Sequence, residues 1–279
     1  MKTLRFFLPF LFLFVIGSSY VPSQKTWVAL GDSITYLNNH LNETGNRVSK
    51  GYMTIVNEEI LELHYINQGH NGWTAKRIAE NIEKLKIEKA ELYTIFLGTN
   101  DWWAGIPAGT MADYESASGT ETVAGSFRVI IDRLKSKNPN AKFILISPMQ
   151  RGDFVYINSF KNNAFGSYKE KNGQSLESIA NVIVEIAKYE NYEAVDLYHN
   201  KKLGLKNMVK YKRLKNPETG AYQDYTYPGY VSIPFDPAKD EYPYPEDAQN
   251  MTYDGLHPSD KGNELIAKLL IQKIKSLKL

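Results

Sequence analysis

The sequence predicts an α/β protein in which helices cover both faces of a doubly wound parallel sheet. Two observations lead to this prediction. Short apolar segments, each typical of a buried strand, alternate along the chain with amphipathic segments of helical periodicity. Each expected strand also ends in a glycine-rich or polar loop, which is where an open α/β sheet presents its ligand-binding crevice. At 279 residues the chain is long enough to bury a substantial core.

The expected elements alternate regularly from the first strand to the closing helix. Strands are expected at residues 26–28, 64–67, 92–97, 142–148 and 193–197, and helices at 52–63, 74–85, about 122–137, 176–189 and 264–277. The strand at 92–97 is the clearest, because its residues form a continuous apolar run that suits burial on both faces of a sheet. Residues 149–172, which include Arg151-Gly152-Asp153, are interpreted as a loop between the fourth strand and the next helix.

The first twenty residues have the composition of a secretory signal peptide. Lys2 and Arg5 precede an apolar run at 6–16, and the small residues Gly17, Ser18 and Ser19 follow it. We therefore expect residues 1–20 to direct export to the periplasm, the cell surface or the medium, and residues 21–279 to form the folded domain. An uncleaved N-terminal anchor is the alternative, although the run is short for a membrane span.

Charge and cysteine content narrow the classes of function. The chain has 33 Lys and Arg against 31 Asp and Glu, and loss of Lys2 and Arg5 with the leader makes the two counts equal. A neutral protein lacks the general positive field that binds nucleic acid or anionic membranes, so neither partner is expected. With no cysteine, disulfides, thiolate metal ligands and lipidated cysteine are excluded. The oligomeric state is left open.

Residues 198–250 interrupt the regular alternation. This segment is rich in tyrosine and proline and poor in apolar periodicity. Loops of this length in a compact domain are usually functional or disordered, and the tyrosine content favours an ordered segment. We expect an insertion over the active face of the sheet.

The residues that can carry chemistry are Ser33, His257 and Asp254. Ser33 follows the first strand within Gly31-Asp32-Ser33, and a serine becomes a nucleophile when an imidazole accepts its proton. His257 lies three residues after Asp254, on a glycine-containing turn before the closing helix, so a carboxylate is placed to orient the imidazole. His40, His64 and His199 are interpreted as lacking a partner at such a spacing.

Acyl transfer by a serine also requires hydrogen-bond donors where the oxyanion develops. The loops after the second and third strands offer them. Gly69 has no side chain to obstruct its N–H, and Asn100 has a side-chain amide. The backbone N–H of Ser33 would be the third donor.

Four sequence blocks together resemble the SGNH (GDSL-type) hydrolases: Gly31-Asp32-Ser33, Asn67-x-Gly69, Gly98-x-Asn100-Asp101 and Asp254-x-x-His257, in this order. The resemblance implies a flavodoxin-like, three-layer α/β/α fold with a five-stranded sheet of order 2-1-3-4-5. It also implies that Ser33 is the nucleophile, His257 the base and Asp254 its orienter, with Ser33, Gly69 and Asn100 forming the oxyanion hole. The family usually requires no metal or other cofactor.

Aromatic residues beside the oxyanion blocks suggest the substrate. Trp102 and Trp103 follow Asn100 directly, and His70 follows Gly69, so these three are candidate substrate-binding residues. Aromatic rings stack on sugars, and together with export they favour a serine esterase that removes acetyl or similar short acyl groups from a carbohydrate. The alternatives are a lysophospholipase- or thioesterase-type lipid esterase and a non-catalytic glycan-binding protein on the same fold.

Overall fold

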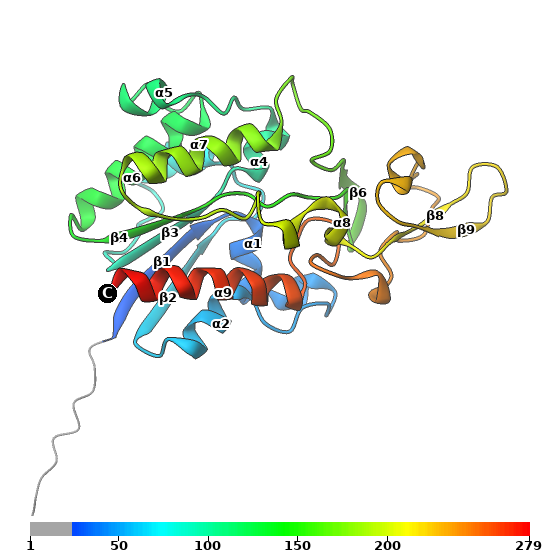
Figure 1. Cartoon of the computed structure of the whole chain (residues 1–279), viewed down its shortest axis with the longest axis horizontal. Helices are drawn as coiled ribbons and strands as arrows, with labels where there is room; N and C mark the ends of the chain where they lie inside the picture. Colours follow the sequence, from blue (N-terminus) through cyan, green and yellow to red (C-terminus); the bar gives the residue numbers. More distant parts are fainter. Residues whose placement is uncertain (1–23) are drawn as a thin grey trace, which may run out of the picture.

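The structure is a computed structural model that describes residues 24–279, so the predicted leader at 1–20 lies outside the described residues. Five parallel strands form the central sheet in the order β2-β1-β3-β4-β7 (Figure 1). Their bounds are Lys25–Gly31 (β1), Leu63–Gly69 (β2), Leu92–Phe96 (β3), Lys142–Ile146 (β4) and Glu193–Val195 (β7). Because β7 is the fifth strand of this sheet along the chain, the predicted order 2-1-3-4-5 is confirmed.

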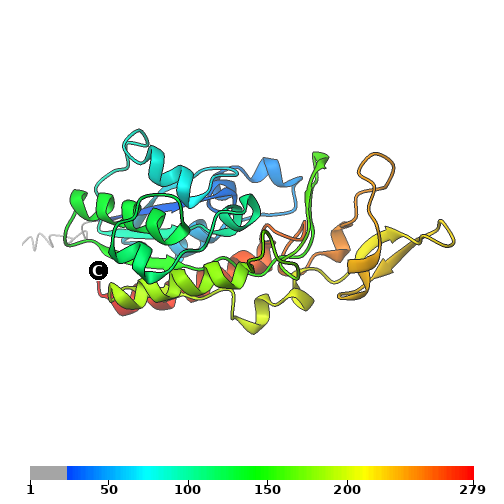
Figure 2. The same ribbon diagram turned by 90° about the horizontal axis from the view of Figure 1, so that it is seen from above.

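Helices cover both faces of the sheet, as predicted (Figures 1 and 2). On one face lie α2 (Tyr52–Glu59) and α9 (Asp260–Leu277), and on the other lie α3 (Ala75–Asn81), α6 (Val123–Lys137) and α7 (Leu176–Tyr189). Each layer buries its own apolar cluster against the sheet. All five residues of β3 are buried, which explains why the sequence there is apolar without alternation.

Side-chain caps determine where the main helices begin. Thr74, Thr122, Ser175 and Ser259 each accept a hydrogen bond from a backbone N–H in the first turn of α3, α6, α7 and α9. The cap at Ser259 starts α9 four residues earlier than the apolar periodicity indicated. The helix expected at 52–63 instead ends at Glu59, and Leu61 just beyond it is exposed.

The carboxyl ends of the strands carry additional short elements. Two are helices, α1 (Ser33–Tyr36) and α4 (Thr99–Ala104), whereas the short α5 (Met111–Glu115) packs on α6 and α7 away from this edge (Figure 1). The segment expected to be a loop at 149–172 contains an antiparallel hairpin, β5 (Phe154–Tyr156) and β6 (Ser159–Ala164). The sequence did not reveal this hairpin, because β6 is polar and largely exposed and therefore lacks the pattern of a strand with one buried face.

The insertion at 198–250 forms ordered elements at the same end of the molecule. It contains α8 (Leu205–Met208) and a second hairpin, β8 (Lys212–Lys215) and β9 (Tyr222–Tyr225). In Figure 2 the β8–β9 hairpin lies beyond the β5–β6 hairpin, as seen from the central sheet. Tyr230 and Tyr244 are buried in a small apolar cluster with Val155 of β5, so tyrosine provides much of the core of the insertion.

Among residues 24–279, no helix combines the length and the apolar character that a membrane span requires. Nor does this part of the chain bring together three or more His, Asp or Glu side chains in an arrangement suited to a metal ion.

Candidate active site

The serine of the first block lies where β1 turns directly into α1. Ser33 is the first residue of α1, and the carboxylate of Asp32 caps this helix by accepting a hydrogen bond from the N–H of Ile34 at 3.0 Å. The turn is tight, since a Cβ on Gly31 would lie 2.1 Å from the hydroxyl of Thr35. The side chain of Ser33 is therefore held at the carboxyl edge of the sheet.

Three side chains form a continuous hydrogen-bonded chain at this edge. The Oγ of Ser33 lies 2.8 Å from Nε2 of His257, and Nδ1 of His257 lies 2.6 Å from Oδ2 of Asp254. Because a carboxylate can only accept, Nδ1 carries a proton, which leaves Nε2 to accept the proton of Ser33. Oδ1 of Asp254 also accepts from the backbone N–H groups of Leu256 and His257, at 3.0 and 2.7 Å. The structure thus brings together the three residues predicted to form the triad.

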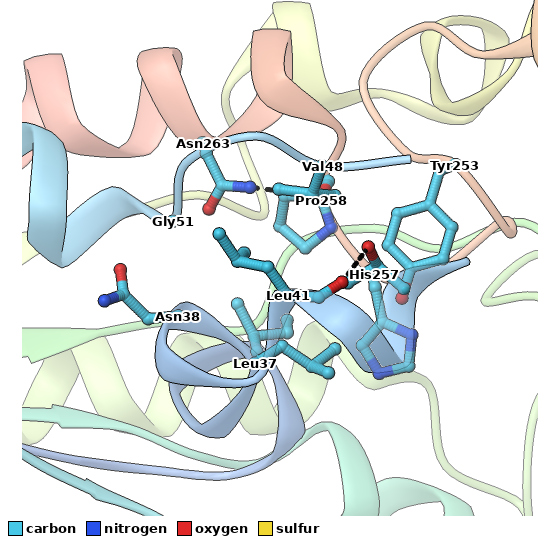
Figure 3. Close-up of a pocket in the computed structure, with 11 residues that line it drawn as sticks. Leu37, Asn38, Leu41, Val48, Gly51, Tyr253, His257, Pro258 and Asn263 are labelled. Carbon is cyan, nitrogen blue, oxygen red and sulfur yellow. Dashed lines mark hydrogen bonds between the residues drawn. The ribbon is translucent and has the colours of Figure 1, made fainter. Parts of the chain in front are cut away.

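Aromatic residues enclose the imidazole of His257. The ring of Tyr253 is stacked near it, with centroids 5.9 Å apart, and Phe154 of β5 meets it edge-on at 5.4 Å. On the Tyr253 side a small pocket of about 10 Å³ is lined by apolar residues such as Leu37 and Leu41 (Figure 3). The backbone N–H of Tyr253 donates to the carbonyl of His257 at 3.1 Å, which holds the turn closed. The base is thus fixed in position and largely shielded from water.

A cavity of about 120 Å³ opens on the other side of the triad. Its lining comes from the ends of several strands and from the β5–β6 hairpin, and consists of Ser33, Asn71, Gly72, Asn100, Trp103, Arg151, Phe154, Asn162, Ala164, Leu256 and His257. None of these residues belongs to the insertion at 198–250. The insertion therefore contributes nothing to the lining of this cavity.

The structure supports Asn100 as an oxyanion donor. The side-chain amide of Asn100 lines the cavity beside Ser33, and Nδ2 donates one hydrogen bond to the carbonyl of Trp73 at 3.0 Å. That bond fixes the orientation of the amide and leaves its second N–H for a ligand.

The structure contradicts the assignment of Gly69 as a donor. The N–H of Gly69 donates to the side chain of Asn67 at 2.8 Å, and Gly69 packs so closely that an added Cβ would lie 2.1 Å from the backbone N of Tyr36. Gly72 lies in the turn after β2, lines the cavity, and has a φ of +73° that favours glycine. It is therefore Gly72 that is positioned to offer a backbone N–H.

Of the three predicted substrate-binding residues, one lines the cavity. Trp103 lies in its wall. Trp102 is fully buried and donates from its indole to the carbonyl of Gln174 at 3.1 Å, so it packs within the protein and cannot touch a substrate. His70 does not line the cavity either; its ring stacks on Trp73 with centroids 4.6 Å apart, and burial lowers its pKa. The prediction is therefore wrong for Trp102 and His70.

A histidine outside the site has a partner that the sequence analysis did not assign. Nδ1 of His199 lies 2.8 Å from Asp196, at the same spacing in the sequence as His257 and Asp254. Both side chains are substantially exposed, and Nε2 of His199 faces Glu177 at 3.3 Å rather than a serine. An aspartate three residues before a histidine thus occurs both in the triad and in a surface pair, so this spacing alone does not identify a catalytic pair.

Burial also affects the acid beside the nucleophile. Asp32 is 2% exposed, and its burial raises the pKa of its carboxyl to about 6, opposed by its hydrogen bond from Ile34 and by the charges of His257 and Arg151. Asp32 makes no hydrogen bond to His257 within residues 24–279, where Asp254 is the carboxylate paired with that imidazole. Asp32 is therefore a helix cap.

Comparisons with known proteins agree with this geometry. A sequence profile described as the GDSL-like lipase/acylhydrolase family matches residues 29–265. The crystal structure of a possible lipase from Chitinophaga pinensis is 59% identical, with a TM-score of 0.91 over 92% of this chain and 100% of that one. A comparison with curated proteins gave no match.

Two more distant structures share the fold. The crystal structure of an acetyl xylan esterase is 18% identical, with a TM-score of 0.53 over 88% of this chain and 98% of that one. An acetylxylan esterase from Geobacillus stearothermophilus is 16% identical, with a TM-score of 0.51 over 91% and 95%. The family profile spans most of the chain and the triad is assembled within it, so this protein belongs to the GDSL-like lipase/acylhydrolase family.

Proposed function

We propose that this protein is an exported serine esterase that removes acetyl or similar short acyl groups from a carbohydrate. The observation that carries the esterase chemistry is the hydrogen-bonded chain from Ser33 through His257 to Asp254. Export rests on the sequence of residues 1–20 alone.

The geometry supports a two-step acyl transfer. The Oγ of Ser33 attacks the ester carbonyl while its proton passes to Nε2 of His257. The N–H groups of Ser33 and Gly72 and the amide of Asn100 stabilise the oxyanion. His257 then returns the proton to the departing alcohol, and water, activated by the same imidazole, releases the acid and regenerates Ser33.

The size and lining of the cavity support the substrate class. At about 120 Å³ it is well below the roughly 300–1,000 Å³ of pockets that enclose drug-sized ligands, so it suits a short acyl group. Trp103 offers an aromatic ring, and Asn71 and Asn162 offer amides, to a polar alcohol such as a sugar. Some proteins of the same fold are named acetyl xylan esterases.

A second candidate, hydrolysis of a lipid ester, is favoured by one feature. A groove of about 330 Å³ adjoins the cavity, sharing Phe154 and Ala164 with it, and Val231, Ile233 and Phe235 give it an apolar wall. A longer acyl chain could extend into this groove.

Acetate release from a panel of acetylated oligosaccharides, measured for the wild type and for Ser33→Ala, tests the proposal. We expect release by the wild type alone, and faster cleavage of acetyl than of long-chain aryl esters. Preference for long chains would favour the lipid ester. Binding of the oligosaccharides without turnover of any ester would instead indicate a glycan-binding protein.

A further inference from the structure

One buried cation in the wall of the cavity plays no part in the chemistry described above. Arg151 lies in the loop between β4 and β5, is 2% exposed, and lines the cavity together with Ser33 and Asn100. Its Nε and Nη2 atoms are buried and make no hydrogen bond within residues 24–279. Buried polar groups are almost always paired, and more so when charged, so an arginine in this state calls for an explanation.

The position of Arg151 is fixed by its surroundings. Its backbone N–H donates to the hydroxyl of Ser167 at 3.1 Å, and its carbonyl accepts from the N–H of Ser167 at 2.9 Å. The guanidinium carbon lies 5.8 and 5.4 Å from the ring centroids of Trp102 and Trp103. These rings stabilise the cation without accepting a hydrogen bond from its N–H groups.

The acids near Arg151 already have other partners. Asp254 accepts from His257, Asp153 accepts from Lys212 at 2.8 Å, and Asp32 accepts from the N–H of Ile34. Their charges keep Arg151 a cation, since its pKa, lowered by burial to about 10, stays well above neutrality. Within the described chain, the guanidinium is thus a charged donor with no acceptor of its own, next to the nucleophile.

We propose that Arg151 binds a carboxylate of the substrate, so that the preferred substrate of this esterase carries a negative charge close to the scissile ester. The planar guanidinium matches the two oxygens of a carboxylate and would gain its missing acceptors from them. This inference rests on the proposed ester hydrolysis and defines its substrate more narrowly. The carboxylate belongs to the alcohol, as in an acetylated uronic acid, or to the acyl group, as in a hemisuccinate.

Matched pairs of esters test this inference and separate the two sources. On the alcohol side, kcat/KM for an acetylated methyl glucuronide is compared with that for the methyl glucoside acetylated at the same position. On the acyl side, p-nitrophenyl hemisuccinate is compared with p-nitrophenyl butyrate. A charge-assisted pair in a buried site predicts that the wild type prefers the anionic member of one pair by roughly 10- to 100-fold.

Two variants and one competition experiment complete the design. In Arg151→Gln the ratio of anionic to neutral kcat/KM should fall to near one. In Arg213→Gln, which alters an exposed arginine of the insertion, the ratio should stay that of the wild type. Because a change at a buried arginine can impair folding, we also compare free glucuronate and succinate with glucose as competitive inhibitors of the wild type, and expect a carboxylate to inhibit more strongly.

The outcomes distinguish this inference from the proposed function. Equal cleavage of both members of each pair, with no extra inhibition by carboxylates, would overturn the role of Arg151 while the esterase remained. If the wild type cleaves no ester, the proposed function fails, and calorimetric titration of the wild type with glucuronate, succinate and glucose then decides on anion binding. Tighter binding of a carboxylate than of glucose would support the role of Arg151, and no difference would overturn it.

Discussion

Replacing Asp254 with asparagine should abolish most of the activity while leaving the fold intact. The carboxylate has two tasks on two different oxygens: Oδ1 accepts from the backbone N–H groups of Leu256 and His257, and Oδ2 accepts from the imidazole. In Asp254→Asn the carbonyl oxygen can keep both backbone bonds only if the NH₂ group faces Nδ1. The imidazole must then accept at Nδ1 and carry its proton on Nε2, so it cannot take the proton of Ser33.

The alternative orientation of the new amide is too costly to restore activity. It would direct the NH₂ group at two backbone donors and leave both unpaired, at about 1–3 kcal/mol each. We therefore expect kcat/KM for an aryl acetate to fall by about 10⁴-fold, which corresponds to about 5.4 kcal/mol at 1.36 kcal/mol per factor of ten.

The assay combines kinetics with unfolding by denaturant. Asp254→Asn should unfold near the wild-type midpoint, whereas Asp254→Ala, which loses both backbone acceptors, should unfold earlier. An Asp254→Asn protein with activity within tenfold of the wild type would refute the argument about the imidazole tautomer.

Three further predictions concern stability. Lys212→Met should lower the free energy of unfolding by about 3–5 kcal/mol, because it removes the positive charge that pairs with Asp153 in a largely buried ion pair. Urea unfolding should show this decrease. The decrease should be smaller in the double variant that also carries Asp153→Asn. Burial raises the pKa of Asp101 from 3.8 to about 6, so this carboxyl should make the free energy of unfolding fall by about 3 kcal/mol as the pH rises from about 4 to 6. Asp101→Asn should remove that decrease when unfolding is measured across this pH range. An unchanged profile in the variant would contradict the assignment. Gly69→Ala should cost more than about 4 kcal/mol, since the new Cβ would lie 2.1 Å from the backbone N of Tyr36, and near-wild-type unfolding would argue against this packing.

The triad and the sheet could be predicted because each depends on local sequence. Strands such as β3 are buried on both faces and therefore appear as continuous apolar runs. Ser33 and Asn100 lie in the first turns of the helices that follow β1 and β3, and His257 lies shortly before α9, so the topology alone brings them to one edge. The position of a residue at the end of a strand or the start of a helix can therefore be predicted from the sequence.

The choice between Gly69 and Gly72 could not be made from sequence. Both glycines follow the same strand, and a missing side chain is the only property the sequence shows. The difference lies in backbone geometry: Gly69 is still within β2 and its N–H is taken by Asn67, whereas Gly72 lies in the next turn at positive φ. Likewise Trp102 and Trp103 are adjacent and chemically identical, and the direction of α4 alone buries one and leaves the other in the cavity.

Arg151 was missed for a different reason. It follows a strand, as Ser33 and Asn100 do, but an arginine in a loop is usually solvated, and no motif marks this one as buried. Its guanidinium packs against two tryptophans of α4, which are distant in sequence. The only available signal was its place at the carboxyl end of the sheet.

The two groups of residues in this cavity therefore have different structural origins. The triad and Asn100 lie at the ends of regular elements of the core, whereas Arg151 and Phe154 lie in the segment that bears the β5–β6 hairpin. That segment is tied to the insertion through the ion pair of Asp153 with Lys212. The insertion thus supports one wall of the cavity beside Ser33 without lining that cavity itself. Substitutions in the insertion should therefore move this wall and change which ester is preferred before they affect the Ser33–His257 contact. The reason is that loops on a rigid scaffold usually determine specificity, while the scaffold holds the reacting groups.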